Sequence, residues 1–286
     1  MILFKIIEKI CASSGLFSYF VKFLIRKLDI IFNFNPEFLV KTNSTLRPNY
    51  AYCIYHSSIL AKRLGHKSVS FVEFGVAGGN GLVFMEKFAN RVKKKLDINV
   101  EIYGFDLGNG LTKPKDYRDL QYWFEEGFYK MDQEKLKKRL SYSKLIIGDV
   151  NITLEKFFEK YSPSPIGAIF HDLDYYHSTL NSFKIFDNED KYYLPRIFNY
   201  FDDILGTELE MYNEFTGELL AINNYNLNSS SKKIVLNRNL ITSNNEKWRS
   251  QIYYFHNFEH EDYNKFIGEK EQEFLNKNIS LRKSIN

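Results

Sequence analysis

The feature that most limits the fold of this sequence is an alternation of short apolar runs with longer amphipathic stretches. Strands are predicted at 69–73, 100–105, 144–147, 166–170 and 196–201. Helices are predicted at 49–64, 81–95, 133–140, 153–161 and 180–186. Strands that alternate with helices in this way form βαβ units, which predicts an α/β fold with a mainly parallel sheet.

The sequence on either side of this alternation predicts less regular structure. The Asn/Ser-rich stretch 223–233 is expected to be a loop, and 233–241 and 251–258 to be late strands at an antiparallel edge. The residues from His260 on are highly charged and are expected to form a frayed helix. Since 286 residues allow one large domain, we predict a helical extension over 1–45, one domain over 46–268 and a charged tail over 269–286.

An amphipathic helix is predicted near the start of the chain. Its apolar residues recur at three- and four-residue steps: Phe17, Phe20, Val21, Leu24, Leu28 and Ile31. Lys22, Arg26 and Lys27 lie elsewhere on its circumference. The apolar stripe could pack on the domain or on a second subunit, or residues 16–32 could lie on an anionic membrane. The sequence leaves these alternatives open.

Charge and cysteine content narrow the class of protein. The net charge is +4 without a block of like charges, so nucleic acid is not an expected partner. Two cysteines cannot make a disulfide framework, which favours a reducing compartment. The longest uncharged stretch near the start has 12 residues, too few to span a membrane, and it lacks the exit site of a signal peptide. We therefore expect a cytoplasmic homo-oligomer, with contact at the inner face of the membrane as an option.

A glycine-rich turn follows the first predicted strand and opens a helix. Glu73 ends the strand, and glycines stand at 75, 78, 79 and 81. Such a turn brings a ligand close to the backbone and to the unpaired N–H groups of the helix. The dinucleotide spacing G-x-G-x-x-G is absent. The acidic residue two positions before Gly75 resembles the pattern of S-adenosylmethionine (SAM) enzymes, and Asp106 after the next strand can accept hydrogen bonds from a ribose diol.

Acidic residues gather after two later strands. Asp172 and Asp174 follow the fourth predicted strand, and Asp202 and Asp203 follow the fifth. The carboxyl ends of parallel strands share one edge, so these carboxylates should converge with the glycine turn. Converging like charges need a cation, and oxygen ligands favour Mg²⁺, Mn²⁺ or Ca²⁺. Asp149 after the third strand is expected either to contact the cofactor adenine or to cap a helix.

At these residues the chain resembles the macrocin O-methyltransferase family of SAM- and Mg²⁺-dependent enzymes that act on sugar hydroxyls. The matching segments are Glu73-Phe-Gly75-Val-Ala-Gly78-Gly79, Phe105-Asp106, Asp172-x-Asp174-x-Tyr176-x-Ser178-Thr179 and Asp202-Asp203. The resemblance covers about residues 69–206 and implies a Rossmann-like class I methyltransferase fold for the domain at 46–268, with SAM bound by Glu73, Gly75, Gly79 and Asp106. Asp149 is added to the predicted cofactor residues because of its place after the third strand. It also implies Mg²⁺ at Asp172, Asp202 and Asp203, with Asp174 as the catalytic base. The expected partner is a small-molecule or glycan acceptor.

Two other functions fit parts of the pattern. Asp172-x-Asp174 is also the D-x-D sequence of metal-dependent glycosyltransferases, although these have no need of the glycine turn. A non-catalytic interaction protein could keep the same fold, although four converging carboxylates would then be costly. His171 and His177 flank the acidic cluster and are expected to be hydrogen-bonding neighbours, with His177 as a second candidate base.

Overall fold

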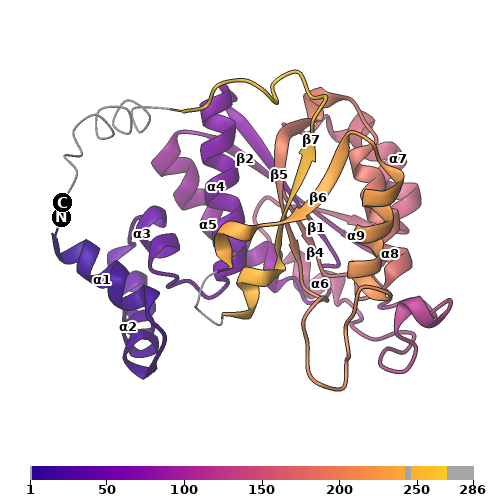
Figure 1. Cartoon of the computed structure of the whole chain (residues 1–286), viewed down its shortest axis with the longest axis horizontal. Helices are drawn as coiled ribbons and strands as arrows, with labels where there is room; N and C mark the ends of the chain where they lie inside the picture. Colours follow the sequence, from indigo (N-terminus) through magenta and orange to yellow (C-terminus); the bar gives the residue numbers. More distant parts are fainter. Residues whose placement is uncertain (1, 242–245, 269–286) are drawn as a thin grey trace, which may run out of the picture.

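A central sheet organises the computed structural model, which describes residues 2–241 and 246–268. Seven strands of this part of the chain pair in the order β3-β2-β1-β4-β5-β7-β6 (Figure 1). They are β1 (Ser68–Phe74), β2 (Asn99–Asp106), β3 (Lys144–Ile147), β4 (Ile166–His171), β5 (Tyr193–Phe201), β6 (Lys232–Leu236) and β7 (Ile252–Asn257). The first five in this order are parallel, and β7 is antiparallel to both β5 and β6. The predicted mainly parallel sheet is confirmed.

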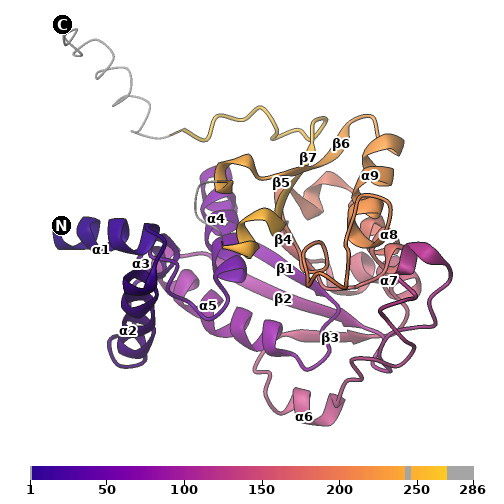
Figure 2. The ribbon, with the colours of Figure 1, turned by 60° about the horizontal axis from the view of Figure 1, so that its bottom comes forward.

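Helices cover both faces of the sheet (Figures 1 and 2). One face carries α4 (Pro48–Leu64) and α5 (Asn80–Leu96), and the other carries α7 (Val150–Tyr161), α8 (Tyr176–Ser182) and α9 (Gly217–Asn228). Successive strand side chains point to opposite faces, so Phe71 and Val72 of β1 belong to two different buried clusters. This three-layered arrangement leaves the strand ends open for a site.

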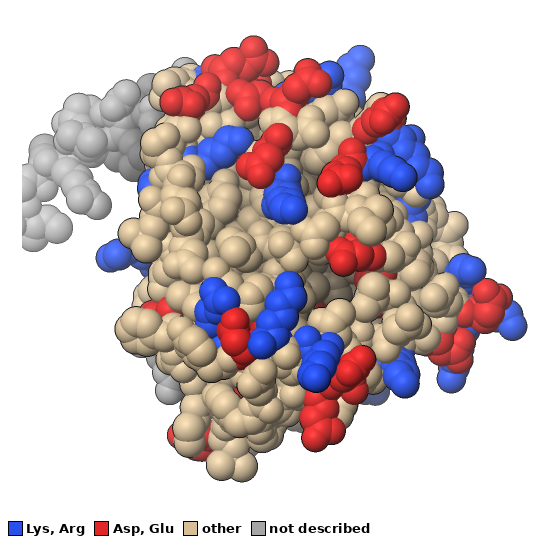
Figure 3. All heavy atoms as spheres, turned by 90° about the vertical axis from the view of Figure 1, so that its right-hand side faces the viewer, with Lys and Arg blue, Asp and Glu red and all other residues tan. Residues whose placement is uncertain are grey.

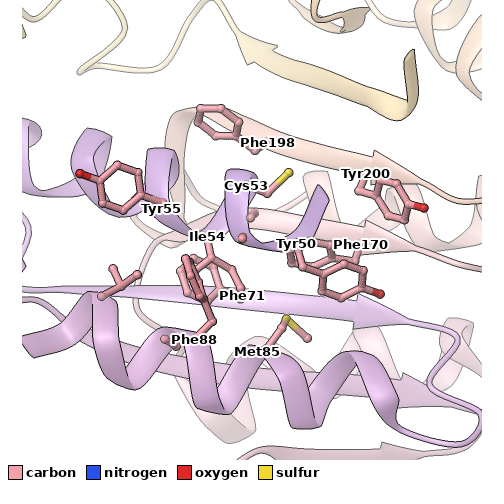
Figure 4. Packing of buried hydrophobic residues seen from close by; sticks show 14 of the residues in the cluster. Tyr50, Cys53, Ile54, Tyr55, Phe71, Met85, Phe88, Phe170, Phe198 and Tyr200 are labelled. Atoms are coloured by element: carbon pink, nitrogen blue, oxygen red, sulfur yellow. The ribbon is translucent and has the colours of Figure 1, made fainter. Parts of the chain in front are cut away.

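The core beneath α4 and α5 is rich in aromatic side chains (Figure 4). Tyr50 of α4 stacks on Phe170 of β4 with ring centroids 4.1 Å apart, and Phe71, Met85 and Phe88 pack beside them. Both cysteines, Cys11 and Cys53, are buried free thiols, as expected. This packing positions the Tyr50 hydroxyl to donate a hydrogen bond to Glu73, at the end of the strand before the glycine turn.

The predicted loop at 223–233 is wrong, because α9 extends through Asn228. The prediction rested on the high asparagine and serine content of the segment, but these asparagines make hydrogen bonds to other parts of the fold. Asn226 Oδ1 accepts from the backbone N–H of Ile234 in β6 at 2.7 Å, and Asn226 Nδ2 donates to the Ile234 carbonyl at 2.7 Å. Ala221 and Ile222 are buried on the same helix. Bonds between α9 and the sheet therefore compensate for weak helix propensity.

Other predicted elements differ at their ends. The helix predicted at 133–140 is the short α6 (Gln133–Lys137), and the helix predicted at 180–186 begins at Tyr176 and ends in a 3₁₀ turn, η2 (Phe183–Phe186). The strand predicted at 233–241 stops at Leu236 and is followed by η4 (Arg238–Leu240). The described residues after His260 form turns rather than a helix, and the predicted tail at 269–286 lies outside the described residues.

Three further helices precede α4: α1 (Ile2–Ala12), α2 (Leu16–Phe32) and α3 (Pro36–Lys41). The predicted amphipathic helix is α2, but of its apolar stripe Val21 packs against the core while much of the rest faces solvent. Phe17, Phe20 and Ile31 are 61% to 74% exposed. No helix within 2–241 and 246–268 has the length and apolar content to cross a bilayer.

Candidate active site

A cavity of about 510 Å³ lies at the carboxyl ends of the parallel strands. Seven of the predicted site residues line it: Gly75, Asp106, Asp149, Asp172, Asp174, Asp202 and Asp203. Open α/β sheets bind ligands at this edge, and the volume is typical of small-molecule sites. Glu73 and Gly79 are not part of this lining.

The surface shown in Figure 3 is hollowed near its centre, and Lys and Arg side chains are interspersed there with Asp and Glu. A nucleic-acid site needs basic side chains clustered on one face. This mixed face does not have that character, and the expectation that nucleic acid is not a partner stays a prediction.

The glycine turn brings the ends of β1 and β4 into contact. Gly75 has a φ of 81°, and a Cβ there would lie 1.7 Å from the Asp172 carbonyl oxygen. Only glycine therefore allows the turn to pass Asp172. Gly79 also has a positive φ, but its missing Cβ leaves room for Leu136 of α6. Gly75 thus shapes the cavity, whereas Gly79 supports the turn from behind.

Asp106, at the end of β2, is tied to the same turn. One carboxylate oxygen accepts from the backbone N–H groups of Val76 and Ala77 at 2.8 and 2.9 Å, and the other accepts from Gly108 at 2.6 Å. A carboxylate has about four acceptor positions, so one is left for a ligand in this arrangement. Binding both hydroxyls of a diol would require one of the backbone bonds to be released.

Glu73 lies beneath the turn rather than in the cavity. It is 2% exposed and accepts a hydrogen bond from the Tyr50 hydroxyl at 2.5 Å, while its other oxygen has no partner among the described residues. A Cβ on Gly81 would lie 1.8 Å from Glu73 Oε1, so the helix start rests directly on this side chain. Burial raises the pKa of Glu73 to about 7. Its geometry fits a support for the turn, and cofactor contact by Glu73 stays a prediction.

Glu73→Gln should make stability less dependent on pH. The folded-state pKa of Glu73 is raised from 4.5 to about 7, so its stabilising contribution is present below pH 4.5 and is lost as the pH rises through 7. One pKa unit corresponds to about 1.4 kcal/mol, so the wild type should lose on the order of 3 kcal/mol relative to the variant. Urea unfolding of both proteins at pH 4.5 and pH 8 measures this difference. Parallel pH profiles would mean that Glu73 is not buried as a carboxylate.

Three carboxylates converge at the floor of the cavity. Asp172, Asp202 and Asp203 each offer an oxygen, and these oxygens lie within 4.8 Å of one another. Burial and then the neighbouring carboxylates raise the pKa of Asp172 well above its ordinary value, and burial and Asp202 raise the pKa of Asp203 to about 7. Each charge is thus unfavourable beside the others. An all-oxygen set of this kind fits a hard divalent cation, which would neutralise the repulsion.

The backbone conformation that places Asp174 at the cavity was not predicted from the sequence. The strand β4 ends at His171, close to the predicted end at 170, and Asp174 adopts a left-handed conformation with a φ of 58°. Its backbone N–H donates to Asp203 Oδ2 at 2.9 Å, which fixes the turn. Asp174 is 5% exposed, and burial followed by Asp203 raises the pKa of its carboxyl. The side chain therefore adjoins the cluster without following strand alternation.

Glu218 of α9 supports this cluster and was missed from the sequence. Its Oε2 accepts from the backbone N–H of Asp203 at 3.0 Å, and its Oε1 has no partner among the described residues. Burial raises the pKa of Glu218, with Asp203 adding to the effect. The residue lies 15 positions after Asp203, inside a helix that was not predicted, so no spacing signal marked it.

A second residue missed from the sequence is Asp119, which pairs with His177. Asp119 is buried in the 3₁₀ turn η1 (Tyr117–Asp119), and its carboxylate lies 2.9 Å from His177 Nδ1. Arg118 Nη2 lies 3.2 Å from His177 Nε2 and can only donate. Nε2 must therefore accept, which leaves Nδ1–H to donate to Asp119. Because its acceptor nitrogen is already occupied, His177 is a weaker candidate for the base than Asp174.

His171 and Asp149 have clear structural roles. His171 is buried, stacks on Phe201 with centroids 4.5 Å apart and contacts Asn199 at 3.1 Å. Burial lowers the pKa of His171 to about 3, so it is neutral. The expectation of a hydrogen-bonding neighbour is confirmed. Asp149 caps α7 by accepting from the backbone of Asn151 at 2.8 Å, and it also lines the cavity.

Comparison with solved structures identifies the fold. Over 88% of this chain and 90% of the other, it is similar to the calicheamicin methyltransferase CalS11, with a TM-score of 0.52 and 17% identity. A similarity to the O-methyltransferase NovP covers 73% of this chain and 77% of that chain, with a TM-score of 0.48 and 12% identity. No protein-family model and no curated protein sequence matches the chain. Together with the strand order, the likeness to CalS11 establishes a Rossmann-like class I methyltransferase fold.

Proposed function

We propose that the protein is a SAM-dependent, cation-assisted O-methyltransferase whose acceptor is a hydroxyl of a sugar or glycoconjugate. The observation that carries the proposal is the convergence, in one cavity of a methyltransferase fold, of the Gly75 turn, Asp106 and the Asp172, Asp202 and Asp203 cluster. Support for the sugar comes from the resemblance of the Asp172–Thr179 and Asp202–Asp203 segments to the macrocin O-methyltransferases.

Two groups of cavity residues would have different roles in the reaction. Gly75 and Asp106 would bind the adenosine of SAM, which supplies a methyl group already activated by the sulfonium. Asp172, Asp202 and Asp203 would hold Mg²⁺ or a similar cation, which lowers the pKa of a hydroxyl and orients it. The residues mainly align two reactants, which is the largest contribution that a site of this kind can make.

Asp174 accepts the proton in the proposed reaction. The acceptor oxygen forms a bond to the methyl carbon as the carbon–sulfur bond breaks, its proton passes to Asp174, and S-adenosylhomocysteine (SAH) leaves. The raised pKa of this buried carboxyl favours proton uptake. His177 is the alternative base, although Arg118 occupies its free nitrogen.

A glycosyltransferase is the alternative enzyme, because Asp172 and Asp174 form a D-x-D sequence. In such enzymes a nucleotide sugar takes the place of SAM. Thermal-shift measurements with SAH, UDP and GDP in the presence of Mg²⁺ separate the two functions. Stabilisation by UDP or GDP but not by SAH would favour the glycosyltransferase, and stabilisation by none of them would favour a non-catalytic interaction protein.

SAH is expected to stabilise the protein by about 2.7 kcal/mol at 100 times its dissociation constant. Asp106→Ala should weaken SAH binding at least about tenfold, the equivalent of 1.4 kcal/mol, because it removes the carboxylate assigned to the adenosine and loosens the turn at Val76 and Ala77. Calorimetric titration of both proteins with SAH measures the change. Asp187→Ala, which removes an exposed carboxylate outside the cavity lining, is the matched control. Equal SAH affinity in the wild type and Asp106→Ala would contradict the assignment.

A further inference from the structure

The helix α2 is attached to the domain through its polar side. Its buried residues are Ser18, Lys22 and one apolar residue, Ile25, and Lys22 is 5% exposed. Lys22 Nζ pairs with Glu246 at 2.7 Å, and near the other end of the helix Arg91 of α5 contacts both oxygens of Asp29 at 2.8 and 2.7 Å. Charge-assisted bonds at two points fix the rotation of the helix.

This rotation turns the apolar side of α2 to solvent, the reverse of an ordinary surface helix. The exposed large hydrophobic residues of α2 are 45% to 90% exposed: Leu16, Phe17, Tyr19, Phe20, Phe23, Leu24, Ile30, Ile31 and Phe32. Leu3, Phe4 and Ile6 of α1 are also about half exposed or more. Large exposed apolar patches of this kind mark protein–protein or membrane interaction sites. We call these twelve residues the α1–α2 surface.

Basic residues surround the α1–α2 surface. Lys5 and Lys9 lie on α1, and Arg26 and Lys27 lie on α2, with the Lys27 ammonium 5.4 Å from the ring centre of Phe23. Directly after α2, a groove between residues 33–36 and α5 is lined by Lys87, Arg91, Lys94 and Lys95. Among the nearby acids, Asp29 is paired with Arg91 and Glu37 with Lys41. Glu8 of α1 offsets one of these positive charges, and the basic residues still outnumber the acids, so the local charge is positive.

We propose that the α1–α2 surface binds an anionic lipid bilayer, with its aromatic and aliphatic side chains at the acyl boundary and its lysines at the headgroups. Exposed apolar residues flanked by Lys and Arg are the combination that such surfaces favour. A second copy of the chain complements the surface less well, because a two-fold contact would bring the two basic rims together. The inference concerns location and does not depend on the proposed methyl transfer.

The full-length protein should float with vesicles of phosphatidylcholine and phosphatidylserine and bind phosphatidylcholine alone more weakly. Each basic residue near an anionic surface favours binding about fivefold, so Lys27→Glu together with Lys94→Glu should weaken it by more than tenfold. Phe20→Ser together with Ile31→Ser should weaken binding to both vesicle types. Leu227→Ser, an 82% exposed leucine on α9, is the matched control and should leave binding unchanged. All these residues are exposed, and the melting temperature verifies folding.

Two outcomes would overturn the proposal. One is failure of the wild-type protein to float with phosphatidylserine vesicles at low salt. The other is a dimer in light scattering that the Phe20→Ser and Ile31→Ser pair converts to a monomer, without any vesicle binding by the wild type. The second outcome would assign the α1–α2 surface to another copy of the chain.

Discussion

Asp174→Asn is expected to slow methyl transfer by about 10²- to 10⁴-fold, the usual contribution of a general base. Asparagine keeps the size of the side chain and tolerates the left-handed conformation at this position, so the turn held by Asp203 should survive. Asparagine cannot take up the proton. SAH affinity should stay close to that of the wild type, since cofactor binding is assigned to Asp106 and the glycine turn rather than to Asp174. Single-turnover kinetics with saturating SAM measures the loss.

Two further variants make this test specific. Asp187→Asn changes an exposed carboxylate outside the cavity lining and should retain wild-type turnover. His177→Gln removes the alternative base. If Asp174→Asn retained near-wild-type turnover while His177→Gln lost it, the Asp119–His177 pair would take the role of the base. Loss of SAH binding in Asp174→Asn would instead identify a structural residue.

Removal of the divalent cation is expected to abolish turnover and to lower the melting temperature. The carboxylates of Asp172, Asp202 and Asp203 repel one another without it, so added Mg²⁺ should stabilise the protein and a chelator should reverse the effect. Asp172→Asn removes one ligand and one charge. It should eliminate the stabilisation by Mg²⁺ and reduce turnover at least about 10²-fold, since a cation contributes several kcal/mol to such reactions.

The comparison with Asp174→Asn is the control for this experiment, because the two substitutions are identical and lie two residues apart. Asp174→Asn should keep the thermal response to Mg²⁺, whereas Asp172→Asn should not. Asp203 is less suitable for the test, because its carboxylate also accepts from the Asp174 backbone and its loss would disturb the turn. A wild-type melting curve indifferent to Mg²⁺ and to chelator would count against the cation site.

The order of strands and helices between 49 and 201 could be predicted because local patterns determine it. Apolar runs such as 166–170 are buried on both faces of the sheet. In the helices between them, apolar residues recur about every 3.6 residues. The helix α9 could not be predicted in this way. Its asparagines favour a loop when only neighbours in sequence are considered, and the bonds from Asn226 to Ile234 exist only once the sheet has formed.

The same distinction applies to the site. Asp172, Asp202 and Asp203 could be brought together from the sequence because each follows a parallel strand, and such ends share one edge. Asp119 and Glu218 could not, because one lies in a 3₁₀ turn of a long connection and the other reaches Asp203 from a helix. The conformation of Asp174 depends on a hydrogen bond from its backbone N–H to Asp203. The residue pattern of β4 gives no indication of this bond.

The placement of α1 to α3 ahead of β1 has a consequence for how this gene can change over generations. None of these helices connects two strands, and α2 joins the remainder through the pairs of Lys22 with Glu246 and Asp29 with Arg91, which lie outside the cavity lining. Codons for the exposed residues of α1 and α2 can therefore diverge without altering the carboxylates between 172 and 203, whereas Cys11, Ile25, Phe38 and Leu39 belong to the hydrophobic core and are constrained by it. The membrane binding proposed for the α1–α2 surface can thus change under natural selection while the active site is retained.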